Sequence, residues 1–98
     1  MLDNFADPDI TISLAAKMSN VSEVYFRKMF KNEFGVSPKK YLINARIRLA
    51  VNLIESGYYS LSEIAAKCGF TDYKYFSTEF GRIMGVSPSK YHYSFKKP

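Results

Sequence analysis

A seven-residue stretch occurs twice in this chain, and the repeat limits what the chain can fold into. Gly35–Tyr41 and Gly85–Tyr91 differ at one position only and lie 50 residues apart. Extended backwards without a gap, the match pairs residues 14–41 with residues 64–91, and 12 of the 28 pairs are identical. Solenoids need at least three stacked repeats. Two copies therefore indicate one domain built from two small units of similar fold.

The composition fits a folded basic domain. The chain has 98 residues, so one domain is expected, and 47% of the residues are hydrophobic, which is enough for a packed core. The net charge of +5 fits a polyanionic partner, although a solvated basic surface explains it equally well. No apolar run reaches the length of a membrane span, and no signal-peptide pattern is present.

Cysteine and histidine each occur once, as Cys68 and His92. A lone cysteine forms no internal disulfide, which favours a reducing, cytoplasmic location. Neither residue has a partner at ligand spacing, so we expect no metal and no cofactor. The sequence also has no paired acids, no nucleophile with its base and no phosphate-binding glycine loop, so we expect no enzyme activity.

Helix signals recur along the whole chain. Capping residues, apolar spacing and glycine stops predict an all-α fold of about seven helices. Six of these span about 14–18, 23–34, 38–56, 61–68, 73–84 and 88–91. Leu2 and Phe5 fit the last turn of a further helix whose start is missing. The expected N-caps are Ser22, Ser37, Ser60 (with Glu63 in a capping box), Asp72 and Ser87, and the expected glycine stops are Gly35 and Gly85.

Three of the expected helices have a distinctive distribution of apolar residues. In helix 23–34, four apolar residues form one face, which we expect to point inward: Phe26, Met29, Phe30 and Phe34. In helix 73–84, the inward face is expected to hold Phe76, Phe80, Ile83 and Met84. Apolar residues cover much of the girth of helix 38–56, so we expect that helix to be buried on more than one side.

Each half of the chain therefore consists of a short helix, a turn and a longer helix with a sharp stop. This order is typical of a helix-turn-helix unit, whose second helix can enter the major groove of DNA. A connecting helix of about 18 residues spans about 27 Å. Two recognition helices joined in this way could lie about one duplex turn, about 34 Å, apart. One chain could then read two successive major-groove segments.

Two other classes of protein remain possible from the pattern. Tandem short helices also build protein-interaction modules, which strong salt dependence of DNA binding would argue against. An enzyme that uses Cys68 is the second alternative, and slow reaction of the thiol would argue against it.

A larger set of residues with characteristic spacing spans residues 10–92. The set consists of Leu14-Ala15-Ala16, Ser22, Phe26, Phe30-Lys31, Gly35, Ser37-Pro38, Tyr41-Leu42, Arg46, Ala50, Ile64-Ala65, Gly69-Phe70, Asp72, Tyr75-Phe76, Phe80, Gly85, Ser87-Pro88 and Tyr91. It resembles the DNA-binding domain of the AraC/XylS family of bacterial transcription regulators. The resemblance implies two helix-turn-helix units, about 10–36 and 60–92, joined by a linker helix of about 38–56.

The resemblance also implies a function. It implies sequence-specific binding of double-stranded DNA, regulation of transcription, more often activation than repression, and contact with RNA polymerase. A sensory or dimerisation domain usually accompanies such a domain in the family. We therefore expect this chain to be part of a longer regulator.

The residues that the resemblance assigns to DNA differ between the units. In the first unit, Val24, Arg27 and Lys28 fall on base-reading positions, with Lys31 beside them. The corresponding positions in the second unit are Tyr73, Lys74, Ser77 and Thr78. Candidates for phosphate contact near helix starts are Ser22, Lys40 and Lys90. The formal charge is +2 over residues 23–31 (three cations and Glu23) and zero over residues 73–81 (Lys74 and Glu79). We therefore expect the first unit to dominate the affinity.

Overall fold

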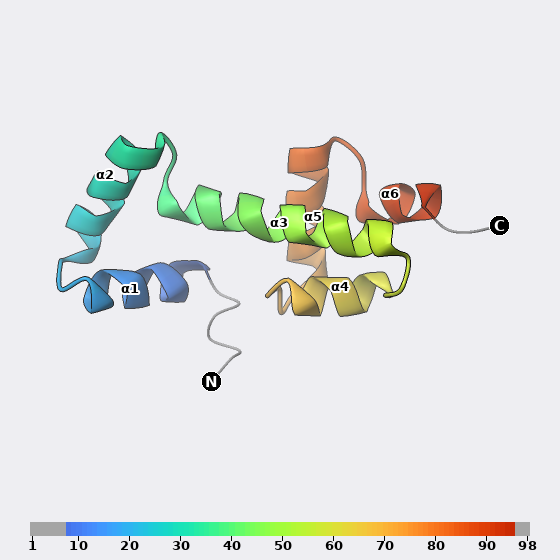
Figure 1. Ribbon diagram of the computed structural model, residues 1–98, viewed down its shortest axis with the longest axis horizontal. Helices are drawn as coiled ribbons and strands as arrows, with labels where there is room; N and C mark the ends of the chain where they lie inside the picture. Colours follow the sequence, from blue (N-terminus) through green and yellow to red (C-terminus); the bar gives the residue numbers. More distant parts are fainter. Residues whose placement is uncertain (1–7, 96–98) are drawn as a thin grey trace. The chain divides into compact units, whose positions relative to one another are not determined.

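The computed structural model describes residues 8–95, in which six α-helices and no strands occur (Figure 1). The helices are α1 (Pro8–Met18), α2 (Glu23–Phe34), α3 (Pro38–Ser56), α4 (Leu61–Lys67), α5 (Tyr73–Met84) and α6 (Pro88–Ser94). The expected all-α fold is confirmed. The further helix expected at Leu2 and Phe5 lies outside the described residues.

The helix ends follow from local capping chemistry. The hydroxyl oxygen of Ser22 accepts from the backbone N–H of Tyr25, and Ser60 and Glu63 form a reciprocal capping box. Gly35 and Gly85 end α2 and α5 with φ angles of 79° and 81°, values that favour glycine. These features were all expected from the sequence.

Two helices are longer than expected. α1 begins at Pro8 rather than near Leu14, and α6 continues past Tyr91 to Ser94. Proline is tolerated in the first turn of a helix, because the N–H that it lacks has no partner within the helix there. Pro8 therefore lies at the start of α1 and does not exclude residues 9–13 from it.

The chain divides into two compact units within α3. Unit 1 is Met1–Ile43 and unit 2 is Asn44–Pro98. Unit 1 thus contains α1, α2 and the first turns of α3, and unit 2 contains the rest of α3 with α4, α5 and α6. Each unit holds one helix-turn-helix pair, α1–α2 or α4–α5.

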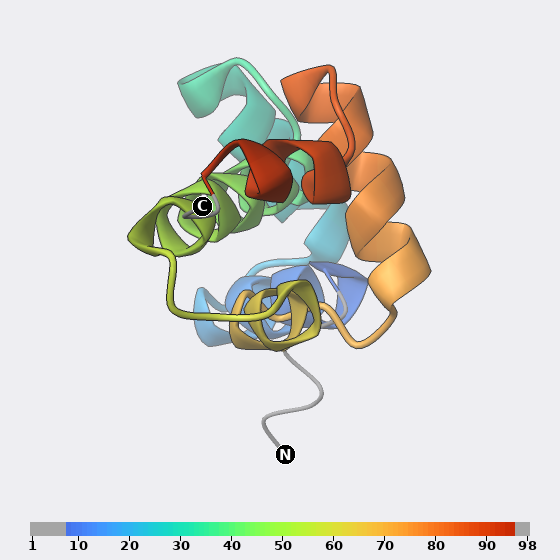
Figure 2. The ribbon, with the colours of Figure 1, turned by 90° about the vertical axis from the view of Figure 1, so that its right-hand side faces the viewer.

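Unit 2 has a closed apolar core. The second half of α3, α4 and α5 surround it, with α6 beside α5 (Figures 1 and 2). The side chains buried in it are Ile47, Ala50, Ile54, Ile64, Ala65, Cys68, Phe70, Phe76 and Phe80. The ring of Phe76 lies 5.7 Å from that of Phe80, and Phe80 lies 5.8 Å from Tyr91. The hydroxyl of Tyr91 donates to Glu55 at 2.7 Å, which links α6 to the end of α3.

The helix α5 is also attached to α3 through the turn that precedes it. A guanidinium nitrogen of Arg46 donates a long hydrogen bond, 3.4 Å, to the carbonyl of Gly69. Gly69 has a φ of 92°, and the α4–α5 turn passes over the Arg46 side chain at this point. The turn is therefore fixed by contact with α3 as well as by its own hydrogen bonds.

The prediction that α3 is buried on more than one side is wrong. Within residues 43–54 of α3, the buried apolar residues are Ile43, Ile47, Ala50 and Ile54. They follow one another at intervals of four, three and four residues, which places them on a single stripe. Leu49, on another side, is 44% exposed.

The predicted gapless alignment of the two halves is wrong by one residue before the turn. The backbone N–H of Val21 bonds to the carbonyl of Ala16, and the N–H of Phe70 bonds to that of Ala65, which is an offset of 49. Ala16 and Ala65 are both buried, at 2% and 3% exposure. The N-caps of α2 and α5, Ser22 and Asp72, are 50 apart. The turn of unit 2 is therefore one residue longer.

Candidate nucleic-acid interface

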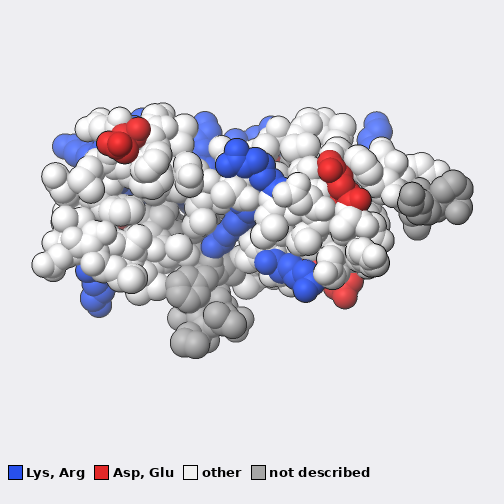
Figure 3. Space-filling model, in the orientation of Figure 1, with Lys and Arg blue, Asp and Glu red and all other residues white. Residues whose placement is uncertain are grey.

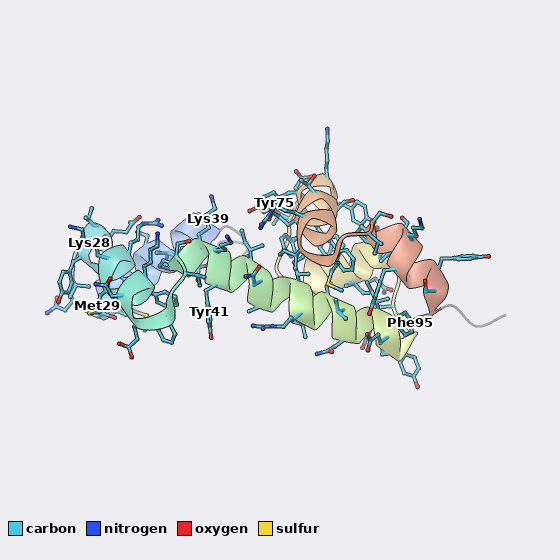
Figure 4. The ribbon with its side chains drawn as sticks, turned by 90° about the horizontal axis from the view of Figure 1, so that it is seen from above. Lys28, Met29, Lys39, Tyr41, Tyr75 and Phe95 are labelled. Atoms are coloured by element: carbon cyan, nitrogen blue, oxygen red, sulfur yellow. The ribbon has the colours of Figure 1, made fainter. Side chains whose placement is uncertain are left out.

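The predicted base-reading residues of unit 1 form an exposed stripe on α2. Val24 is 70% exposed, and Lys28 and Lys31 are also exposed. Arg27 lies between them and is half-buried. Spacings of three, one and three residues place all four on one side of the helix. In Figure 4, Lys28 and Met29 point to different sides of α2.

An ion pair on α2 holds one of these cations. A guanidinium nitrogen of Arg27 lies 3.0 Å from a carboxylate oxygen of Glu23, one helical turn earlier. The hydrogen bond from Arg27, followed by one from Ser13, lowers the pKa of Glu23 below its usual value. The side chains of Arg27 and Glu23 are 35% and 43% exposed, so solvent screens the pair and the guanidinium can exchange its partner. Spacing of i and i+4 in the sequence could have predicted this pair.

The candidate residues of unit 2 also lie on the surface of their helix. Tyr73 is 39% exposed, Lys74 and Thr78 are exposed, and Ser77 is half-buried. The Thr78 hydroxyl donates to the backbone carbonyl of Lys74 at 3.0 Å, so its oxygen stays free to accept. The ring of Tyr73 lies 5.6 Å from the buried ring of Phe76. Lys74 is the one charged residue in this set.

The phosphate candidates lie at helix starts. Ser22 is the N-cap of α2, and its hydroxyl hydrogen can still be donated outward. Lys40 and Lys90 occupy the same position of the repeat, and their backbone N–H groups bond to the hydroxyls of Ser37 and Ser87 at 3.2 Å. Both lysine side chains are exposed in the first turn of α3 and α6. A helix N-terminus with an exposed lysine suits an anion.

Two exposed residues near these sets were not predicted. Tyr25 is 55% exposed on α2, and Arg82 lies in the last turn of α5. Arg82 donates to Glu79 at 3.0 Å through its Nε atom. The charge count over residues 73–81 stopped one residue before Arg82. In Figure 3, basic side chains lie on the surface of each unit taken by itself.

Cys68 has the environment of a core residue. Its side chain is 4% exposed, and burial raises the pKa of its thiol to about 11. The described residues contain no group of three or more His, Cys, Asp or Glu side chains that could hold a metal ion. Within residues 8–95, no helix is both long and apolar enough to cross a membrane.

Known proteins match most of this chain. The family model of a helix-turn-helix domain matches residues 15–93. The probable transcriptional regulator LumQ of Photobacterium leiognathi is 31% identical over 97 residues, which are 95% of this chain and 39% of that protein. The transcriptional activator RhaR of Pectobacterium carotovorum is 41% identical over 69 residues, 70% of this chain and 24% of that protein. The chain thus spans well under half the length of these relatives.

Two solved structures have the same fold. The C-terminal domain of AraT, a response regulator of Geobacillus stearothermophilus, is 35% identical with a TM-score of 0.85, and the match covers 99% of this chain and 80% of that one. The DNA-binding domain of AdpA, solved with a target DNA, is 28% identical with a TM-score of 0.82. That match covers 96% of this chain and 84% of the AdpA domain. Together with the repeated capping motifs and the two helix-turn-helix pairs, these likenesses show that the chain belongs to the AraC/XylS family of transcription regulators, as a tandem helix-turn-helix domain.

Proposed function

We propose that this chain binds a specific site on double-stranded DNA, with α2 and α5 in successive major-groove segments. The exposed stripe of Val24, Arg27, Lys28 and Lys31 is the observation that carries this proposal. The stripe lies on a capped helix. The chain is also similar to the DNA-binding domain of AdpA, which was solved with a target DNA. The groove is about 12 Å wide and accepts one such helix.

The side chains of the stripe supply different contacts. Arg27 can give up Glu23 and donate two hydrogen bonds to guanine O6 and N7, or contact a phosphate. Val24 can touch a thymine methyl group. Lys28 and Lys31 add charge without the planar fork of arginine. Ser22, Lys40 and Lys90 fix the register through phosphates.

Unit 2 contributes less to affinity and reads DNA through Tyr73, Lys74, Ser77, Thr78 and the shape of the groove. Three cations and one acid lie on the stretch 23–31, whereas Lys74 and Glu79 cancel over 73–81. Arg82 adds one cation at the end of α5 but is engaged by Glu79. Affinity for DNA follows the number of phosphates that cations neutralise.

The wider role is regulation of transcription, more often activation, in contact with RNA polymerase. The name of RhaR, a transcriptional activator, supports this direction. Because the relatives are much longer than this chain, we propose that it acts as the DNA-binding part of a longer regulator with a sensory or dimerisation domain. Bacterial DNA lies in the cytoplasm, so the proposed function places the chain there.

Arg27→Ala is expected to weaken binding to the preferred site by about 10- to 100-fold, because a bidentate contact to guanine is lost. The site is first selected from a random duplex library, and affinity is then measured at fixed salt. Lys74→Ala removes the same charge from unit 2 and is the matched control, with an expected loss of about threefold. A larger loss for Lys74→Ala than for Arg27→Ala would contradict the ranking of the units. Failure to enrich any site, with weak salt dependence, would favour a protein-interaction module.

The Cys68 thiol is expected to react with a thiol reagent at pH 7.5 at least about 100-fold more slowly in the folded chain than in urea. Its raised pKa keeps it protonated, and its burial blocks access. The rates are followed by absorbance of the released thiolate. A fast reaction in the folded chain would revive the alternative of an enzyme that uses Cys68.

A further inference from the structure

The C-terminal end of α3 departs from the charge pattern of the other described helices. Each of those five helices has a basic residue in its last turn: Lys17, Lys31, Lys67, Arg82 or His92. The last turn of α3 has no basic residue and contains Glu55 instead. Cations stabilise the negative end of a helix dipole, and anions destabilise it. Negative charge is therefore concentrated at the end of α3, and no residue of its last turn offsets that charge.

A cavity of about 490 Å³ lies at this end of α3, within unit 2. Its lining includes Glu55 of α3, Tyr58 and Tyr59 of the α3–α4 loop, His92 of α6, and Phe95. Figure 4 shows Phe95 near the C-terminal end of α3. Among residues 8–95, those that line the cavity include no lysine and no arginine. A cavity of this size accepts a small ligand or one long side chain.

The Glu55 carboxylate is positioned by α6. The Tyr91 hydroxyl donates to one of its oxygens at 2.7 Å, and this hydrogen bond raises the pKa of Tyr91. The hydroxyl therefore keeps its proton and continues to donate. An ionised carboxylate has two oxygens and about four acceptor positions. Glu55 is exposed, so it retains acceptor positions for a second donor that arrives from solvent.

The aromatic residues beside Glu55 already bind one cation of the chain. The Nζ atom of Lys67 lies 4.9 Å from the centroid of the Tyr59 ring, which is a cation–π contact. The ring of Tyr58 lies 6.4 Å from that of Tyr59, and Tyr58 is 86% exposed. Flat rings next to a carboxylate suit a guanidinium or ammonium group, because the rings attract its charge while the carboxylate accepts its N–H groups.

We propose that the cavity at the end of α3 binds a guanidinium or ammonium group from outside the chain, on Glu55 and the rings of Tyr58 and Tyr59. A metal ion suits it less, since Ca²⁺ takes six to eight oxygen ligands and Glu55 is the one carboxylate among the described lining residues. DNA is a polyanion, which Glu55 repels. None of the candidate DNA-binding residues lines the cavity, so the inference does not rest on the function proposed above.

The probe for this site is N-acetylarginine N-methylamide, a blocked arginine residue, titrated at pH 7.5. The matched control is the citrulline analogue, which has a similar shape and an uncharged urea group in place of the guanidinium. The amide NMR shifts of residues 56–60 and 92–95 are followed in each titration. We expect a saturable change at these amides with half-saturation at about 1 mM for the arginine probe. Binding of the citrulline analogue should be about tenfold weaker or less.

Glu55→Gln should weaken binding of the arginine probe about tenfold or more. Glutamine keeps an oxygen that can accept from Tyr91, and removal of an anion from a helix C-terminus should leave the urea midpoint unchanged or raise it. Tyr58→Leu should weaken binding about threefold. Glu33→Gln removes an exposed carboxylate from unit 1 and should leave binding unchanged. Unaltered binding in Glu55→Gln, equal binding of the citrulline analogue, or no saturable change would each overturn the proposal.

A second probe separates the two sources of such a group. n-Propylguanidinium has the same charged group without peptide groups. Tighter binding of the blocked arginine would indicate a side chain of a partner protein, and equal or tighter binding of n-propylguanidinium would indicate a free small molecule. Binding that occurs only after Lys96→Gln and Lys97→Gln are introduced together would identify the chain's own lysines as the occupants. That result would overturn the proposal of an outside ligand.

Discussion

Phe80→Ala should destabilise α5 by about 3–5 kcal/mol, the usual cost of removing a fully buried phenyl ring. Phe80 is 0% exposed, and its ring lies 5.7 Å from Phe76 and 5.8 Å from Tyr91. Alanine would leave a cavity between α3, α5 and α6, because tightly packed neighbours collapse only partly. The free energy of unfolding is measured by native-state hydrogen exchange of the α5 amides.

The matched control is Phe30→Ala, at the equivalent position of α2. Phe30 is only half-buried and lines a cavity of about 300 Å³ with Met29 and Phe34, so we expect its loss to cost about half as much or less. Hydrogen exchange of the α2 amides gives this value in the same experiment. Equal losses at the two positions would mean that the face of α2 is covered in solution.

Gly69→Ala is expected to destabilise unit 2 by about 2 kcal/mol or more. A φ of 92° costs an L-residue about 1–2 kcal/mol in the left-handed region. The new Cβ would also lie 3.2 Å from the Cζ atom of Arg46, so the guanidinium that donates to the Gly69 carbonyl must shift by a few tenths of an ångström. Urea denaturation and hydrogen exchange of α4 and α5 measure the loss.

Gly35→Ala separates the two causes of this loss. Gly35 has a similar φ of 79°, but no neighbouring heavy atom lies within 4 Å of a Cβ at that position. Its substitution should cost the backbone strain alone, about 1 kcal/mol. If Gly35→Ala and Gly69→Ala cost the same, the Arg46 contact adds nothing to the stability of the turn.

Helix ends were predictable because capping is local. Ser22, Ser60 and Asp72 each accept a hydrogen bond from a backbone N–H two or three residues later, and Gly35 and Gly85 adopt the left-handed conformation. A side chain within three residues decides each of these features. The pattern of the sequence therefore predicted five of the six described helices to within about three residues at each end.

Burial was less predictable, because it depends on segments far away in the chain. Within residues 8–95, the same apolar pattern gave two fully buried residues on α5, Phe76 and Phe80, and none on α2. The exposure of Leu49 on α3 was missed for the same reason. The pattern of α2 specifies which side is apolar, and the rest of the polypeptide decides whether that side is covered.

The candidate DNA-binding residues were predicted from the resemblance and from spacing on the helix. The structure places Val24, Lys28 and Lys31 on an exposed stripe of α2. It also shows that Glu23 and Arg27 form an ion pair. The formal charge of residues 23–31 included both residues but did not predict their contact. Which bases these side chains contact depends on the DNA, so the assignment stays a prediction.

The extra residue in the turn of unit 2 determines where the two halves can be exchanged to build hybrid regulators. Ala15-Ala16-Lys17 and Ala65-Ala66-Lys67 look like a natural junction, yet the equivalent backbone positions are 49 apart before the turn and 50 apart after it. A crossover at the paired alanines would therefore add or delete one residue of the helix before the turn, and would rotate the transplanted second helix of the pair by about 100° relative to the first. Crossovers at Ser22 and Asp72 keep each helix with its own cap. Recombinants joined there should retain the register that DNA reading requires.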